Sequence, residues 1–182
     1  MELIELIDRC RGGDEQAFAA LFHKYKNLVY KTAYLMLGDP DEAEDVLQEV
    51  FVQVYKSLDA YDPGKGAFTT WLHRITVNRC LNWRRKRRPS LPLDRVHIPL
   101  PSPEGRMEEE AVWQAVKGLS DKLRAVVVLR YYWELSYAEI AQILDIPLGT
   151  VKSRLNLALR TLRKELEAKE ASAKTRLSQQ EV

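Results

Sequence analysis

Basic side chains lie among aromatic side chains in residues 64–88, a segment with eight Lys or Arg residues and no acidic residue. Guanidinium and ammonium groups bind phosphates, and flat rings stack on unpaired bases. The turn YDPGKGAF (61–68) precedes them and can bring Lys65 close to a ligand. This pattern is compatible with the capture of a single strand or a flipped base, although Phe68 and Trp71 taken alone are more typical of core rings. It is also compatible with a solvated helix end whose rings, Phe68 and Trp71 among them, belong to the core.

Acidic side chains dominate the preceding segment, where Asp39 to Asp62 hold eight acidic residues against one Lys. At helical spacing they form a stripe with an apolar centre and a charged rim, which resembles a protein-binding surface. Its members are Asp41, Asp45, Gln48, Val52 and Tyr55, with Glu44 and Glu49 at the flanks. An ordinary solvated face explains the stripe equally well. No nucleophile or histidine accompanies the carboxylates, so the pattern does not indicate catalysis.

The stretch AEIAQILDIPLGTVKSRL (138–155) has the pattern of a helix-turn-helix. A short helix is expected from Ser136, a break at 145–147, and a second helix with one apolar stripe. The opposite side of that second helix collects Gly149, Lys152, Ser153, Asn156 and Arg160. A small, cationic and hydrogen-bonding face near a helix start suits the major groove of DNA. The alternative is a helical hairpin whose charged face is only solvated.

The elements that must position these residues are all predicted to be helices, which gives an all-α protein. A long amphipathic helix is expected around residues 18–37, and Asp39 with Pro40 predicts the start of the next. Five prolines between Pro89 and Pro103 predict an extended, flexible linker. The expected organisation is a helical unit at 1–88, a linker at 89–106, a second helical unit at 107–168 and a fraying polar tail at 169–182.

Composition excludes several classes of protein. Cys10 and Cys80 stand far apart, and three scattered histidines lack metal-ligand spacing, so neither a disulfide framework nor a metal site is expected. The first ten residues lack the basic region of a signal peptide, and no run reaches the roughly 20 apolar residues of a membrane span. These features predict a soluble cytoplasmic protein without a cofactor or a small-molecule substrate.

The order of these blocks resembles a known family. DEAEDVLQEVFVQVYKSLDAYDPGKGAFTTWLHRITVNRCLNWRRKRR looks like region two, and LSDKLRAVVVLRYYWELSYAEIAQILDIPLGTVKSRL like region four, of the bacterial extracytoplasmic-function sigma factors. The resemblance implies a non-enzymatic, dissociable subunit that binds core RNA polymerase and directs initiation at promoter DNA. It also implies an anti-sigma partner, often membrane-anchored. A stand-alone helix-turn-helix regulator and a nucleic-acid-processing enzyme are the alternatives.

The resemblance also assigns residues to partners. The acidic helix would dock on the clamp helices of the largest polymerase subunit through Asp41, Asp45, Gln48, Glu49 and Tyr55. The minus-ten element would be read and melted by Lys65, Phe68, Trp71, Arg74, Asn78, Arg79, Trp83, Arg84, Arg85, Arg87 and Arg88. The minus-thirty-five element would be read by Thr150, Lys152, Ser153, Arg154, Asn156 and Arg160. Leu157 departs from the family pattern, which usually has an arginine there, so DNA shape is expected to carry more of the discrimination.

Overall fold

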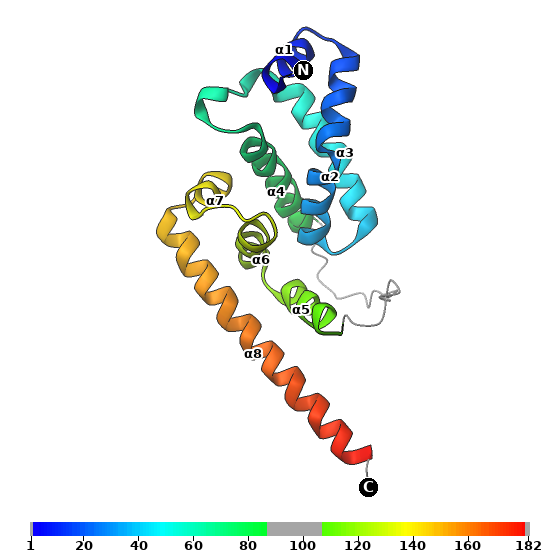
Figure 1. Cartoon of the computed structure of the whole chain (residues 1–182), viewed down its shortest axis with the longest axis vertical. Helices are drawn as coiled ribbons and strands as arrows, with labels where there is room; N and C mark the ends of the chain where they lie inside the picture. The colour runs from blue at the N-terminus through cyan, green and yellow to red at the C-terminus, as the bar shows by residue number, and fades with distance from the viewer. Residues whose placement is uncertain (1, 87–106, 181–182) are drawn as a thin grey trace.

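Helices joined by short turns make up the part of the chain that the structure describes (Figure 1). The computed structural model describes residues 2–86 and 107–180, and neither range contains a strand. The all-α prediction is therefore confirmed. The predicted linker at 89–106, together with Arg87 and Arg88, lies outside the described residues.

Four α-helices form the N-terminal domain. In chain order its elements are α1 (Leu3–Arg11), α2 (Glu15–Leu37), α3 (Pro40–Ser57), the 3-10 turns η1 (Leu58–Ala60) and η2 (Pro63–Lys65), and α4 (Phe68–Lys86). Helices α2, α3 and α4 pack against one another, and α1 packs on α2. Along α3, Ala43, Val46, Val50 and Val54 are completely buried. Their spacing of three and four residues places them on one face, and each valine contributes about 1.5–3 kcal/mol when it leaves water.

Local sequence fixes the ends of α2 and α3. The Asp14 carboxylate accepts a hydrogen bond from the Ala17 N–H at 3.0 Å and begins α2. Gly38, with a φ of 79°, adopts the left-handed conformation that ends it. Asp39 then accepts from the Glu42 N–H at 3.0 Å, and Pro40 occupies the first turn of α3, as the sequence predicts.

The C-terminal domain contains the helix-turn-helix. In chain order its elements are α5 (Met107–Gly118), α6 (Asp121–Val127), the π-helical turn η3 (Val128–Tyr132), α7 (Tyr137–Leu144) and α8 (Leu148–Gln180). Ser136 and Glu139 form a reciprocal capping box at the start of α7. Asp145, with a φ of 54°, ends α7 in the left-handed conformation. The predicted start at Ser136 and the predicted break at 145–147 are both observed.

Helix α8 is longer than the sequence pattern suggests. It continues to Gln180, so residues 169–180 are helical, whereas the sequence pattern predicts a fraying tail there. Its C-terminal half extends away from the other helices in Figure 1. The first turns carry the packed residues, since Val151, Leu155 and Ala158 are buried. The sequence contains a signal for this longer helix, because no glycine or proline, the residues that disfavour helices most, occurs between Thr150 and the C-terminus.

The two domains pack directly against each other. Helix α4 contacts α7, and α2 contacts α6 and η3. One cluster of buried apolar side chains runs from α1–α4 into α6, η3, α7 and the start of α8. The sequence predicts two units on either side of a linker and gives no sign that they share a core. No helix among the described residues has the length and apolar character needed to cross a membrane.

Candidate nucleic-acid interface

The predicted acidic stripe lies on the exposed side of α3. Asp41, Asp45, Gln48 and Glu49 are all exposed, opposite the buried valines. Tyr55 is 63% exposed, and its ring meets the edge of Phe18 at 5.2 Å between centroids. We call these four residues and Tyr55 the acidic face. It presents carboxylates around exposed apolar surface, an arrangement that suits a basic protein partner.

Arg79 connects α4 to the acidic face. Its Nη2 donates to Gln53 Oε1 at 3.0 Å, and its Nη1 lies 3.4 Å from Glu49 Oε2. The structure thus brings together one residue predicted to contact DNA and one predicted to contact polymerase. In this arrangement Arg79 bridges α3 and α4, and it is not a free cation available to a phosphate.

A polar stripe runs along the exposed side of α4. Arg74, Asn78 and Arg85 are exposed, and Trp71 is half-buried at its N-terminal end. Asn82 is exposed on the same stripe, four residues after Asn78, and was not among the residues predicted from the sequence. The spacing of four residues from Asn78 was the sequence signal that could have identified Asn82. We call Trp71, Arg74, Asn78, Asn82 and Arg85 the α4 face.

Trp71 is held in place by other aromatic rings. Its ring centroid lies 5.5 Å from that of Tyr61 and 5.5 Å from that of Phe68. Phe68 itself is only 2% exposed and also packs on Tyr25 at 5.0 Å. The prediction that Phe68 contacts DNA is therefore corrected: its ring is a core element beneath Trp71. A ring fixed in this way is pre-organised for stacking on a base.

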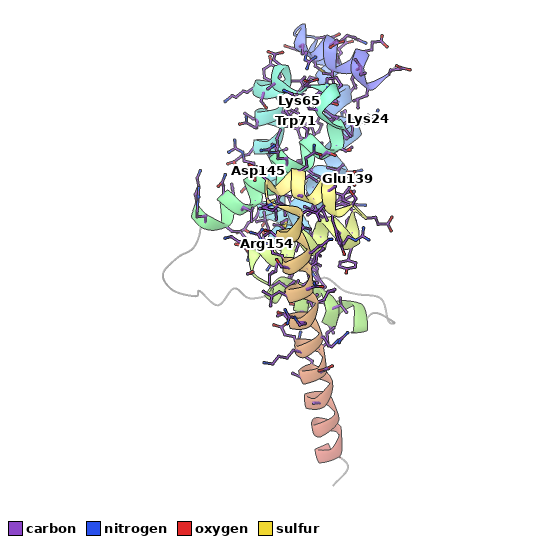
Figure 2. All side chains as sticks on the ribbon, turned by 90° about the vertical axis from the view of Figure 1, so that its left-hand side faces the viewer. Lys24, Lys65, Trp71, Glu139, Asp145 and Arg154 are labelled. Carbon is purple, nitrogen blue, oxygen red and sulfur yellow. The ribbon has the colours of Figure 1, made fainter. Side chains whose placement is uncertain are left out.

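The loop before α4 keeps Lys65 in solvent. The Asp62 carboxylate accepts a hydrogen bond from the Gly64 N–H at 2.9 Å, and Tyr61 donates its hydroxyl proton to the Gly66 carbonyl at 3.2 Å. These bonds fold the loop without using the Lys65 side chain, which is exposed and lies 3.7 Å from Asp62. Figure 2 shows Lys65 and Trp71 close to each other in the N-terminal domain.

The C-terminal end of α4 turns partly toward the other domain. Arg84 Nη1 donates to Asp121 Oδ1 of α6 at 2.8 Å, and Trp83 is half-buried against the core. Both residues were predicted to contact DNA, and this packing occupies them instead. Of the arginines at 84–88 that the structure describes, Arg85 is exposed and faces solvent on the α4 face.

The predicted DNA-reading residues of α8 divide into exposed and half-buried groups. Lys152, Ser153, Asn156 and Arg160 are exposed, and we call them the recognition face. Thr150 and Arg154 are half-buried at the edge of the packed side. Leu157 is 48% exposed beside the recognition face. The side chain there offers a methyl-rich surface where an arginine would offer hydrogen-bond donors.

Among the described residues one histidine is buried, and its burial bears on stability. His73 of α4 is 2% exposed, and burial lowers the pKa of its imidazole from 6.5 to about 4. Its Nδ1 lies 3.5 Å from the Thr32 hydroxyl. The described residues include no cluster of His, Cys, Asp or Glu with metal-binding geometry. Cys10 and Cys80 are both buried free thiols, and burial raises the pKa of each.

Acidification is expected to destabilise the fold through His73. The unfolded state binds a proton at this imidazole below pH 6.5, whereas the folded state does so only near pH 4. Stability is therefore complete above pH 6.5 and falls as the pH drops toward 4. Between pH 7.5 and pH 5 the loss is about 2 kcal/mol. Urea unfolding at the two pH values should show a smaller difference for His73→Gln. An equal difference in both proteins would contradict this assignment.

Comparisons with known proteins match both domains. Residues 21–89 match the family model for Sigma-70 region 2, and residues 109–162 match the model for Sigma-70, region 4. The ECF RNA polymerase sigma factor SigW of Bacillus subtilis (strain 168) is 37% identical over 184 residues, which cover 91% of this chain and 97% of SigW.

Solved structures are similar as well. CnrH, in complex with the cytosolic domain of CnrY, matches with a TM-score of 0.67 and 26% identity over 90% of this chain and 96% of that chain. The sigma factor RpoE of Bartonella quintana, in complex with the anti-sigma factor NepR, shares the fold with a TM-score of 0.69 and 24% identity, over 82% of this chain and 96% of that one. The two family models and the nearly full-length match to SigW show that this chain belongs to the ECF family of RNA polymerase sigma factors.

Proposed function

We propose that this sigma factor uses three separate surfaces to place core RNA polymerase on a promoter. The acidic face of α3 binds polymerase, the α4 face with Lys65 binds the minus-ten element, and the recognition face of α8 binds the minus-thirty-five element. The observation that carries this assignment is the separation of charge, with carboxylates exposed on α3 and cations exposed on α4 and α8. Opposite charges match a basic protein partner and a phosphate backbone respectively.

Polymerase docking is assigned to the acidic face, through Asp41, Asp45, Gln48, Glu49 and Tyr55. The clamp helices of the largest catalytic subunit are the expected partner, as the family resemblance implies. The exposed Tyr55 ring supplies apolar area within the charged rim. Aromatic anchors of this kind contribute most of the binding energy in protein interfaces.

Promoter melting is assigned to the N-terminal domain. Trp71 would stack on an unpaired base, while Lys65, Arg74 and Arg85 hold phosphates and Asn78 forms hydrogen bonds to base edges. Stacking of one base contributes about 1–3 kcal/mol, which offsets the few kcal/mol needed to unstack it. Arg79 is paired with Gln53 and Glu49 of α3, Arg84 is paired with Asp121 of α6, and Trp83 packs against the core, so a role for these residues on DNA requires those contacts to break. Arg87 and Arg88 are further candidate phosphate ligands.

Recognition of the upstream element is assigned to α8. Lys152, Ser153 and Asn156 are the side chains proposed to reach base edges, and Arg160 to reach a phosphate. Thr150 and Arg154, at the edge of the packed side, are proposed to contact the DNA backbone. Leu157 offers only apolar contact, for example with a thymine methyl group.

Lys152→Ala is expected to weaken binding of the minus-thirty-five element about tenfold, because one good base contact discriminates by about 1–3 kcal/mol. The measurement is a titration of the upstream duplex with polymerase-bound sigma factor. Lys164→Ala, an exposed lysine further along α8, is the matched control. An unchanged Kd for Lys152→Ala would remove this residue from the recognition face.

The proposed domain boundaries follow these three assignments. We propose an N-terminal unit at 1–88 for polymerase binding and the minus-ten element, and a C-terminal unit at 107–168 for the minus-thirty-five element. The connection at 89–106 would act as a flexible tether, so that each weak DNA contact raises the effective concentration of the other. The extension at 169–182 has no assigned contact.

Regulation and location belong to the same proposal. We propose that an anti-sigma partner, often membrane-anchored in this family, controls the protein, and that it acts in the cytoplasm with the polymerase. CnrH and RpoE, two proteins of similar structure, were each solved with a bound partner. As an initiation factor, the chain would contribute binding and positioning, while the polymerase carries out the bond formation.

A footprint of the complex with polymerase tests the three-surface assignment. Core polymerase with this protein should protect two DNA segments separated by an unprotected spacer. The Lys152→Ala variant should weaken only the upstream protection. A footprint that does not respond to this protein, or a single palindromic site protected without polymerase, would contradict the proposal.

A further inference from the structure

Helix α1 precedes residues 21–89, the part of the chain that matches the family model for Sigma-70 region 2. It nevertheless contacts η1, the first turn of the segment that connects α3 to α4, and Figure 1 shows α1 beside that segment. We call residues 58–67 the α3–α4 loop. The proposed promoter melting depends on this loop, because it presents Lys65 and leads into the end of α4 that carries Trp71.

Arg11, the last residue of α1, binds the start of the α3–α4 loop with its guanidinium group. Its Nη2 donates to the Tyr61 carbonyl at 2.5 Å and to the Leu58 carbonyl at 3.2 Å. Its Nε also donates to the Leu58 carbonyl, at 3.4 Å. Hydrogen bonds from a charged donor are stronger than those between neutral groups, and a planar guanidinium can bond two acceptors at once. Arg11 therefore fixes two carbonyls of the loop to the end of α1.

Tyr61 connects this fixed start of the loop to its end and to Trp71. The Tyr61 side chain is 6% exposed, and its hydroxyl donates to the Gly66 carbonyl at 3.2 Å. Its ring lies 5.5 Å from the Trp71 ring and meets the Phe68 ring edge-on at 5.2 Å. Because the carbonyl and the ring of one residue share a Cα atom, a bond that fixes the Tyr61 carbonyl also restricts where its ring can lie.

The carbonyl bonds, and not the ion pairs of Arg11, account for its position. Its Nη1 lies 3.1 Å from Asp8 Oδ1 and its Nε 4.0 Å from Asp59 Oδ1, but these carboxylate side chains are 61% and 89% exposed. Solvent screens such pairs, so each contributes little. The Arg11 side chain itself is only 28% exposed.

The helix dipole does not explain the contact either. A cation in the last turn of a helix is favourable wherever its side chain points. Arg9 lies in the same last turn of α1 and pairs with Asp14, at the start of α2, at 2.7 Å. Arg11 instead reaches across to the α3–α4 loop, 47 to 50 residues further along the chain.

A fixed loop favours base capture for an entropic reason. A loop that samples several conformations must be ordered when its ligand binds, and this ordering weakens binding. The bonds from Arg11 order the loop, and through Tyr61 the surroundings of Trp71, before any DNA arrives. The cost of ordering is then met when the domain folds, and the unpaired base meets a ring that is already in place.

We propose that Arg11 is a positioning residue for promoter melting, which acts on the captured base through the Leu58 and Tyr61 carbonyls, the Tyr61 ring and Trp71. Helix α1 is thereby part of the melting site, although Arg11 itself does not contact the base. This inference rests on the proposed function of Trp71 at the minus-ten element.

Paired substitutions test whether Arg11 acts through Trp71. Arg11→Met keeps an unbranched side chain and removes the hydrogen-bond donors, so promoter opening by the polymerase complex should slow about fivefold. The affinities for core polymerase and for the upstream duplex should not change. In a Trp71→Ala background, Arg11→Met should slow opening by less than about twofold further. Equal slowing in both backgrounds would mean that Arg11 acts independently of Trp71, for example on a phosphate, and would overturn the proposal.

Asp8→Asn is the matched control for the ion pair of Arg11. It removes the carboxylate charge beside the guanidinium and leaves the bonds to the Leu58 and Tyr61 carbonyls in place. Promoter opening by this variant should keep the wild-type rate. Slowing as large as that of Arg11→Met would assign the effect to the ion pair and would overturn the role of the carbonyl bonds.

Amide hydrogen exchange in the free, full-length protein tests the loop directly. The Gly64 and Lys65 amides donate to Asp62 at 2.9 and 3.0 Å, so they report on loop order. Arg11→Met should speed exchange of these two amides at least about fivefold and leave the amides of α2, α3 and α4 within about twofold of wild type. Unchanged exchange in the loop, or equally faster exchange throughout the N-terminal domain, would overturn the proposal.

Failure of the proposed function would give a different result. If Trp71→Ala alone opened the promoter at the wild-type rate, base capture by Trp71 would be excluded, and the inference that rests on it would fall too. If Trp71→Ala slowed opening and Arg11→Met slowed it equally in both backgrounds, the proposed function would stand and only the role of Arg11 would be overturned.

Discussion

Asp45→Lys is expected to abolish co-purification with core RNA polymerase. Asp45 is exposed at the middle of the acidic face, between Asp41 and Gln48 on neighbouring turns of α3. A lysine there would replace attraction to a basic partner by repulsion. Close charge pairs in protein interfaces contribute about 1.5–7 kcal/mol, so the reversal should weaken binding at least about a hundredfold.

The matched control for this reversal is Glu5→Lys, which makes the same change of charge at an exposed position on α1. It should keep wild-type affinity in a polymerase pull-down and in a titration of labelled sigma factor. Both variants should keep a free energy of unfolding within about 1 kcal/mol of that of the wild type, because neither side chain is buried and charges on an exposed helix turn contribute about 0.3–1 kcal/mol. Full polymerase binding by Asp45→Lys would remove the acidic face from the proposal.

Trp71→Ala is expected to slow promoter opening at least about tenfold while polymerase binding is retained. The Trp71 ring is fixed between Tyr61 and Phe68 at the N-terminal end of the α4 face. Its loss removes a stacking contact of about 1–3 kcal/mol with the captured base. The measurement is the fluorescence of a base analogue in the minus-ten element, followed after mixing with the complete polymerase complex.

Trp71→Phe separates stacking from a general loss of packing. A smaller flat ring keeps both the contact with Phe68 and a surface for the base, so this variant should open the promoter at a rate between those of wild type and Trp71→Ala. The acidic face lies on a different helix, so neither substitution should change the affinity for polymerase. Wild-type opening by Trp71→Ala would exclude base capture by this residue.

Local sequence signals predicted the helices well. Asp39 and Pro40 begin α3 as expected, and Ser136 begins α7 with a capping box. These features depend on residues within one turn of each other, so they are visible in the sequence. Helical spacing also predicts the exposed acidic stripe and the recognition face. On each helix, the apolar residues that pack against the core identify the opposite, exposed side.

Contacts between the domains could not be predicted in the same way. Arg84 resembles the other arginines of its cluster, and only the packing of α6 reveals Asp121 as its partner. Arg124 looks like an ordinary surface cation, yet it is buried against carbonyls from α2 and α5. From the sequence, Phe68 could be either a base-stacking ring or a core ring. Its contacts with Tyr25 and Tyr61 in the structure identify it as a core ring. These outcomes depend on side chains distant in sequence, which periodicity does not report.

Mapping of transcript 5′ ends tests the central claim most directly, namely that one chain connects polymerase and promoter through surfaces of opposite charge. Core polymerase should be incubated with genomic DNA, with and without this protein, and the RNA 5′ ends sequenced. The account predicts new start sites at a constant distance downstream of a shared pair of sequence elements, and their loss with Asp45→Lys. Start sites identical to those of core polymerase alone would contradict it.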